Sequence, residues 1–260
     1  MEERKQKEIE HYDAHAREWL EQNPDDAKRG DFEGFDPRIL KSFRFCYALL
    51  KKEIKGKKVL DYGCGNGVHL PFLAEHAAEV VAIDLSGPSL AIAAERLKKS
   101  GHEKNVSLVT MDCEKLDFPD NSFDMIFDGG TFSSIDLDRA LPELARVLKP
   151  GGCLIGIETL GHNPLANLNR VLNKKSGKRT EWAASHIVRI SDVSRIKKYF
   201  DDVTLWFFHP LSFLAFPLLS IPGGQAPYQI FELLDALILA IPPLRRYAFK
   251  TVFILQSPRK

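Results

Sequence analysis

The sequence has few of the residues that mark metal-binding, disulfide-bonded or nucleic-acid-binding proteins. Its 260 residues include 4 cysteines, none in a C-x-x-C pair, and no His/Cys cluster has the spacing of a zinc site. The formal net charge is only +1, so no overall field favours nucleic acid as a partner. We therefore expect reduced thiols in an intracellular protein, no bound metal and no nucleic-acid partner.

Secretory and membrane-spanning segments are also missing from the pattern. The stretch MEERKQKEIEHYD lacks the apolar core of a signal peptide, so we expect a cytoplasmic protein. Between Val203 and Pro243 the only charged residues are Glu232 and Asp235, but prolines interrupt the segment before it offers the ~20 apolar residues that a span needs. We expect an apolar cap on the core. A surface toward a membrane or a lipid-like substrate, or a true span, stays open as an alternative.

The middle of the chain alternates short apolar runs with helix-forming segments. This alternation predicts an α/β fold with a doubly wound, mostly parallel sheet. Strands are expected at 57–63, 79–86, 105–112, 123–130 and 153–160, with helices at 66–77, 88–101 and 136–148. The run 149–152 is expected to form a turn before the fifth strand.

The two ends of the chain flank this alternating part. We expect helices at 3–20 and 38–53, a polar loop at 21–37, a partly helical insertion at 161–186, a helix at 190–200 capped by Ser191 or Asp192, and strands at 203–209 and 247–258. This gives seven strands in all. We divide the chain into a helical lid at 1–56, an α/β core at 57–160 and, within the same domain, a substrate cap with the apolar segment and final strands at 161–260.

The run Val59–Gly67 (VLDYGCGNG) carries the clearest functional signal. Glycines at alternate positions follow an expected strand and precede an expected helix, where the backbone can come close to a ligand. The spacing G-x-G-x-G differs from the dinucleotide fingerprint G-x-G-x-x-G, which disfavours a nicotinamide dehydrogenase. Asp61, two residues before the first glycine, would repel a phosphate and suits a ligand that carries positive charge.

This run resembles motif I of the class I S-adenosylmethionine (SAM)-dependent methyltransferases, and the resemblance is strong over residues 57–160. Asp84 and Asp112 end the second and third expected strands, and the run LARVLKPGG at 144–152 is similar to the family's approach to strand five. The resemblance implies a Rossmann-like methyltransferase fold, SAM as co-substrate and methyl transfer as the activity. The insertion at 161–186 is loosely similar to bacterial members that modify small molecules, lipid-linked compounds or saccharides.

Cofactor contacts follow from the same resemblance. It implies that Asp84 accepts the ribose hydroxyls, that Asp112 and Cys113 lie at the adenine, and that the end of the fourth strand lines the methionine part of SAM. Tyr12 would contact the cofactor from an N-terminal helix that folds over it, with Trp19 packing this lid. The full set of expected contacts is Tyr12, Asp61, Gly63, Cys64, Gly65, Gly67, Asp84, Leu85, Asp112, Cys113 and Asp128.

The methyl acceptor is less well determined by the sequence. A hydroxyl acceptor needs a nearby base, whereas an amine needs only to arrive neutral. His162 is our first candidate base and His186 the second, with Glu158 behind them. We expect transfer to an O or N atom of a small-molecule, lipid-like or saccharide acceptor. A non-catalytic SAM-fold binding or scaffold subunit is the alternative, and the sequence predicts no oligomeric state.

Overall fold

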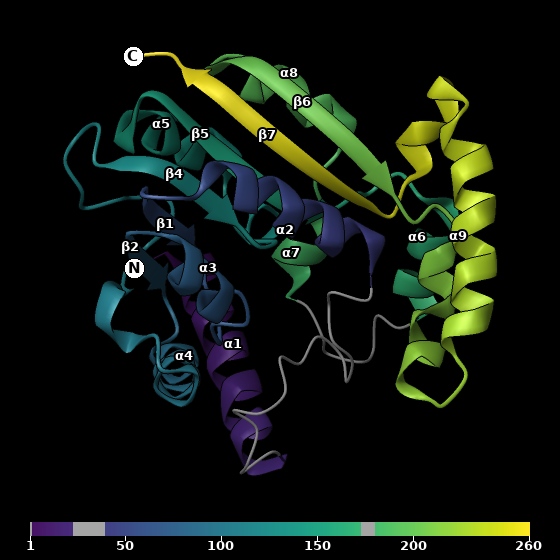
Figure 1. Ribbon diagram of the computed structural model, residues 1–260, viewed down its shortest axis with the longest axis horizontal. Helices are drawn as coiled ribbons and strands as arrows, with labels where there is room; N and C mark the ends of the chain where they lie inside the picture. The colour runs from purple at the N-terminus through teal and green to yellow at the C-terminus, as the bar shows by residue number, and fades with distance from the viewer. Residues whose placement is uncertain (1, 23–39, 173–179) are drawn as a thin grey trace.

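A computed structural model describes residues 2–22, 40–172 and 180–260, and its central feature is a twisted sheet (Figure 1). Within the described residues this sheet has seven strands in the order β3-β2-β1-β4-β5-β7-β6. The first five strands run parallel, while β7 is antiparallel to both of its neighbours, β5 and β6. The predicted fold class is therefore confirmed. The strands are β1 Lys58–Tyr62, β2 Glu79–Asp84, β3 Val106–Thr110, β4 Phe123–Asp128, β5 Leu148–Thr159, β6 Phe200–Phe208 and β7 Lys250–Pro258.

Helices cover both faces of the sheet because its side chains alternate between two apolar clusters. Val59 faces the cluster that includes residues of α2, α3 and α4, whereas Leu60 faces the one that includes α5 and α8. The α-helices of the described residues are α1 Glu3–Gln22, α2 Lys41–Glu53, α3 Leu70–His76, α4 Gly87–Ser100, α5 Leu137–Val147, α6 Pro164–Leu172, α7 Glu181–Ser185, α8 Val193–Ile196 and α9 Gln225–Leu239.

The ends of α4 follow from its sequence, as expected. The Ser86 side chain accepts a hydrogen bond from the Ser89 amide at the N-terminus, and Gly101 ends the helix with a left-handed φ of 73°. The preceding helix, α3, begins at Leu70 rather than at residue 66. Its start is delayed because residues 66–69 still belong to the glycine turn, with Gly67 at φ 74°.

Two further expectations were wrong in detail. Residues 149–152 form no separate turn: they lie inside β5 as an irregularity, where the partner of Phe123 is Leu148 and the partner of Met125 is Cys153. The segment 190–200 is a 3₁₀ turn (η6, Ile190–Asp192) followed by the short α8 rather than one helix. Asp192 does not cap from outside, because its carboxylate accepts from the Arg189 amide at the start of that turn. The polar loop expected at 21–37 lies almost entirely outside the described residues.

Between β6 and β7 the chain leaves the sheet and forms a helical hairpin. It consists of the 3₁₀ segment η7 (Ser212–Ser220), α9 and the 3₁₀ segment η8 (Pro242–Tyr247), at the right of Figure 1. Phe213, Phe216 and Leu219 of η7 are buried, as the expected cap requires. No helix in the described part of the chain is both long and apolar enough to cross a membrane.

Candidate cofactor site

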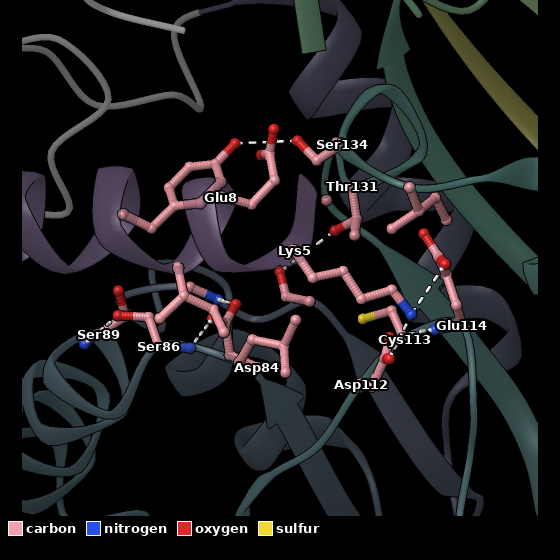
Figure 2. A pocket seen from close by; sticks show the side chains of 18 of the residues that line it. Lys5, Glu8, Asp84, Ser86, Ser89, Asp112, Cys113, Glu114, Thr131 and Ser134 are labelled. Carbon is pink, nitrogen blue, oxygen red and sulfur yellow. Dashed lines mark hydrogen bonds and ion pairs between the residues drawn. The ribbon is translucent and has the colours of Figure 1, made fainter. Parts of the chain in front are cut away.

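A cavity lies at the carboxyl ends of β1, β2 and β4, where parallel sheets place their binding sites, and α1 covers it. Its volume is about 900 Å³ with the open mouth included. Figure 2 shows the side chains that line it. From α1 these are Arg4, Lys5, Glu8, Ile9 and Tyr12, and from the sheet edge they include Gly63, Gly65, Asp84, Leu85, Asp112, Cys113, Gly129, Gly130 and Thr131.

The glycine turn after β1 forms one wall of this cavity. Gly65 has φ 52°, and a Cβ built there would meet no atom within 4 Å, so its backbone is open to a ligand. Gly67 has a different environment. A Cβ on Gly67 would lie 2.7 Å from the Ala93 Cβ of α4, and Gly67 lines neither this cavity nor its neighbour. Gly67 thus packs closely against α4, and its contact with the cofactor stays a prediction.

Asp84 is held rigidly at the end of β2. Its Oδ2 accepts from the Gly65 amide (2.9 Å) and its Oδ1 from the Ser86 amide (2.8 Å). Burial raises the pKa of this carboxyl, although these amides lower it. The Ser86 hydroxyl in turn donates to Asp13 of α1 at 2.6 Å. Asp84 thus orients the glycine turn and lines the cavity at the same time.

A second cavity adjoins the first, because Gly63 and Gly129 line both. Asp61 lies in its wall and is 1% exposed, and its Oδ2 has no hydrogen-bond partner among the described residues. Burial, and secondarily the charge of Asp84, raises the pKa of Asp61 to about 8. With this pKa the carboxyl is mostly protonated at pH 7, and a cationic group beside it would favour its ionised form. SAM carries two such groups, an ammonium and a sulfonium. The residues present therefore fit this co-substrate. Cys64 lines the second cavity as well.

The far end of the first cavity is closed by charged side chains. Lys5 extends from α1 toward Asp112 and Glu114 (Figure 2), with its Nζ 2.5 Å from Asp112 Oδ2 and 2.9 Å from Glu114 Oε2. Arg4 donates to both oxygens of Glu114, at 2.6 and 2.7 Å. Near the mouth, the Tyr12 hydroxyl lies 2.9 Å from Ser134 Oγ. Asp112 and Tyr12 therefore both line the cavity, as does Cys113.

Asp128 supports the site without lining it. It is fully buried and lines neither cavity, and its Oδ1 accepts from the Thr131 amide at 2.9 Å. Burial and the neighbouring Glu158 raise its pKa well above the usual range. Asp128 thus shapes the turn whose residues Gly129, Gly130 and Thr131 do line the first cavity.

The two histidines proposed as bases lie away from these cavities. His162 Nε2 accepts from the Ile190 amide at 3.2 Å, and burial lowers its pKa. His186 stacks on Trp182, with ring centroids 3.6 Å apart, in a third cavity that shares Ile135 with the first. Neither histidine lines the two cavities beside the glycine turn, and their catalytic role stays a prediction. The side chain of Trp19 lies outside the described residues.

One histidine at the site was missed by the sequence analysis. His69 is buried in the wall of the second cavity with Asp61, and its Nδ1 lies 2.7 Å from the Tyr47 hydroxyl. Burial lowers the pKa of His69 to about 4, so the imidazole is neutral at pH 7. Its position two residues after Gly67 was a usable signal, but the helix expected from residue 66 concealed it. The described residues contain no group of three or more His, Cys, Asp or Glu side chains that could hold a metal ion.

Comparison with known proteins shows which domain and which fold the chain resembles. Residues 59–152, which carry the glycine turn and strands β1 to β4, match the family model described as "Methyltransferase domain". A phosphoethanolamine N-methyltransferase from Haemonchus contortus, solved with phosphomonomethylethanolamine and S-adenosylhomocysteine, shares the fold with a TM-score of 0.62. The two are 20% identical, over 95% of this chain and 58% of that one.

Curated relatives match part of the chain. The ubiquinone/menaquinone biosynthesis C-methyltransferase UbiE of Pasteurella multocida is 39% identical over 108 residues, which are 40% of this chain and 40% of the relative. A phosphatidylethanolamine N-methyltransferase of Cereibacter sphaeroides is 35% identical over 121 residues, 45% of this chain and 59% of the relative. The matched stretches thus span about half the length of these relatives. Residues 59–152 of the chain thus match a methyltransferase domain.

Proposed function

We propose that the chain transfers the methyl group of SAM to an O or N atom of a small, lipid-like acceptor. The observation that carries this proposal is the Asp61 oxygen, buried without a partner among the described residues, in a cavity that adjoins the one lined by Asp84. Asp61 offers a carboxyl group to a cation, and Asp84 offers one to hydroxyl donors. A phosphate-bearing dinucleotide would gain no binding energy from Asp61.

When bound, SAM supplies an activated methyl on its sulfonium, so the chain's own residues mainly bind, orient and exclude water. Asp84 would accept the ribose hydroxyls, and Asp61 would pair with the ammonium. Asp112 and Cys113 would lie toward the adenine. Helix α1 would shield the ligand from solvent through Lys5 and Tyr12, which already line the cavity.

The acceptor class is supported by the names of the relatives. One is a C-methyltransferase of ubiquinone and menaquinone biosynthesis, and the other is an N-methyltransferase of phosphatidylethanolamine, so both names point to lipid-like acceptors and the second to an N atom. We propose an acceptor of that general kind, with a saccharide as the less favoured choice. In keeping with it, we propose a cytoplasmic protein that touches a membrane surface through residues 203–243.

A non-catalytic SAM-binding subunit is the second candidate. One observation favours it: neither His162 nor His186 lines the cavities beside the glycine turn. An amine acceptor needs no such base, so the observation weighs against hydroxyl acceptors more than against catalysis.

Replacing Asp84 tests the proposal. Asp84→Asn should weaken S-adenosylhomocysteine binding, measured by calorimetry, by about tenfold or more, because hydrogen bonds to a charged acceptor are each worth about 1.5–3 kcal/mol. The matched control is Asp117→Asn, at an exposed position. Transfer of a tritiated methyl from SAM is then assayed against a lipid extract and a polar extract. Equal affinity of Asp84→Asn and wild type would reject the site, and tight binding without transfer to either extract would favour the non-catalytic candidate.

A further inference from the structure

Helix α9 has part of its polar and apolar surface reversed relative to an ordinary surface helix, while Phe231 and Leu239 still pack on the core. Its buried residues are Tyr228 and Asp235, whereas Ile230, Leu233 and Leu237 are 61%, 70% and 69% exposed. The exposed positions follow the spacing i, i+3, i+7, which places them on one side of the helix. A helix that turns its leucines outward presents a face suited to an apolar phase.

The reversal is fixed by hydrogen bonds at the base of the hairpin. Asp235 accepts from the amides of Leu211 (2.7 Å) and Ser212 (3.2 Å), and so closes the start of η7. The Tyr228 hydroxyl donates to Glu232 at 2.8 Å and accepts from the Lys41 amide of α2 at 3.3 Å. Rotating α9 to bury its leucines would break each of these contacts, so the apolar face is held outward.

Neighbouring segments also expose apolar side chains. Leu214, Leu218 and Ile221 are exposed on and just after η7, and Leu165 and Leu168 are exposed on α6. The side chain of Asn163 ties these segments together, because its Nδ2 donates to the Pro210 carbonyl (2.9 Å) and to the Tyr247 carbonyl (2.7 Å). These are the two ends of the hairpin, so α6 and the hairpin form one platform.

The charges on the hairpin are of one sign where they are exposed. Between residues 209 and 249 the acidic residues are Glu232 and Asp235 and the basic ones are Arg245 and Arg246. Asp235 is buried and Glu232 half-buried, whereas both arginines are exposed just beyond the end of α9. An apolar face bordered by cations complements a bilayer with anionic headgroups. A second copy of the chain would instead bring a further pair of cations.

The platform and the cofactor cavity share one edge of the sheet. Strand β6 runs parallel to β5, since both are antiparallel to β7, and the hairpin begins directly after the carboxyl end of β6. The cavity lies at the carboxyl ends of β1, β2 and β4, which are also parallel to β5. A surface contacted by the hairpin therefore lies on the side of the molecule where ligands enter.

We propose that the exposed face of α9 and η7, with Arg245 and Arg246 at its border, docks the protein on anionic phospholipid bilayers. The face would bring a lipid-like acceptor to the cofactor cavity, and in this respect the inference rests on the proposed function. Docking itself needs no methyl transfer, so the two can fail separately.

Vesicle co-sedimentation of the full chain tests the docking. Vesicles of phosphatidylcholine with about a third phosphatidylglycerol should bind the wild type, and the double variant Leu233→Gln, Leu237→Gln should bind at least about tenfold more weakly, because glutamine keeps the helix but removes the apolar contact. Arg245→Gln with Arg246→Gln should bind these anionic vesicles about tenfold more weakly than the wild type does. On vesicles of phosphatidylcholine alone the two proteins should bind equally. Lys98→Gln with Lys99→Gln, an exposed basic pair at the end of α4, should bind as the wild type does.

Calorimetry with S-adenosylhomocysteine keeps the outcomes separate. All three double variants should bind it as the wild type does, which also shows that they are folded. If the wild type does not bind the anionic vesicles, or if the leucine variant binds them equally well, the docking is overturned. So does a dimer in analytical ultracentrifugation that the leucine variant dissociates while no vesicles bind. Vesicle binding without methyl transfer would leave the docking intact and remove the proposed function.

Discussion

Helices α1 and α9 are the two long helices outside the sheet's own layers, and they meet their surroundings in opposite ways. Helix α1 is rich in charge, yet it covers a cavity and makes its contacts through Arg4, Lys5 and Tyr12. Helix α9 is rich in leucine and isoleucine, yet it covers little and exposes most of them. The polarity of a helix therefore does not by itself indicate whether the helix covers a cavity.

The difference lies in what each helix has opposite it. Helix α1 faces the carboxylates of Asp112 and Glu114, so its cations are paired where they become buried. Helix α9 faces backbone amides of η7 and α2, so its polar side chains turn inward and its apolar ones are left outside. In both helices the orientation is the one that gives these buried polar side chains their partners.

Removing α1 should reveal the largest difference between the roles of the two helices. Deletion of residues 1–20 takes away the five cavity-lining residues of α1, and we expect S-adenosylhomocysteine affinity to fall about a hundredfold, or roughly 2.8 kcal/mol. Vesicle binding should not change. Isothermal calorimetry and co-sedimentation on the same preparation measure both, with circular dichroism as the check on folding. Unchanged affinity would mean that α1 is no lid.

A smaller change tests whether charge holds α1 in place. Glu114→Gln leaves the partly buried Arg4 and Lys5 without their shared carboxylate, whose pKa their hydrogen bonds lower against the effect of burial. We expect a loss of about 2 kcal/mol in the free energy of unfolding in urea. Asp117→Asn, at an exposed position on the same loop, should change it by less than about 0.5 kcal/mol. Similar values for the two variants would show that the pairing contributes nothing.

Mild acid should loosen the attachment of α9 before that of α1. His209 joins the hairpin to α2 through Ser212 Oγ (2.8 Å) and Ser42 Oγ (2.9 Å), and burial, with the nearby cations Lys250, Lys41 and Arg44, lowers its pKa to about 3. A histidine with a depressed pKa binds its proton more readily when its segment is open. Stability is therefore full above about pH 6.5 and falls as the pH drops toward 3.

Between pH 7 and 5.5 the expected loss is about 1 kcal/mol. Hydrogen exchange, corrected for its intrinsic pH dependence, should show it in α9 and η7 but not in α1, because hydrogen bonds from Arg4 and Lys5 lower the pKa of its anchor Glu114 against the effect of burial. In His209→Gln the difference between the two pH values should disappear. Equal loosening of both helices would contradict this assignment.

The cofactor side of the molecule was largely predictable from the sequence, because it follows from strand ends. Asp61, Asp84 and Asp112 each close an apolar run, and parallel strands bring their carboxyl ends to one edge. Gly67 illustrates the limit: its spacing matches its neighbours, but whether a glycine faces a ligand or a helix depends on the packing of Ala93. No sequence spacing records that contact.

Contacts that join distant segments were less predictable. His69 pairs with Tyr47, and Lys5 with Asp112, across separations that no local pattern encodes. The segment 203–243 was expected to cover the core, and η7 does so. The outward face of α9 depended on Asp235, whose partners lie 23 and 24 residues earlier in the chain.

The strand order sets the sequence in which these parts can be assembled during synthesis. Strand β6 pairs in the sheet with β7, and β7 follows the hairpin along the chain. Until residues 250–258 have left the ribosome, β6 lacks the strand that joins it to β5, and the base of the hairpin has no fixed position. The strands that carry Asp61, Asp84 and Asp112 can pair well before that. A growing chain would thus complete the half that carries the first cavity before the half that carries the hairpin, which delays exposure of the leucines of α9 in their final arrangement.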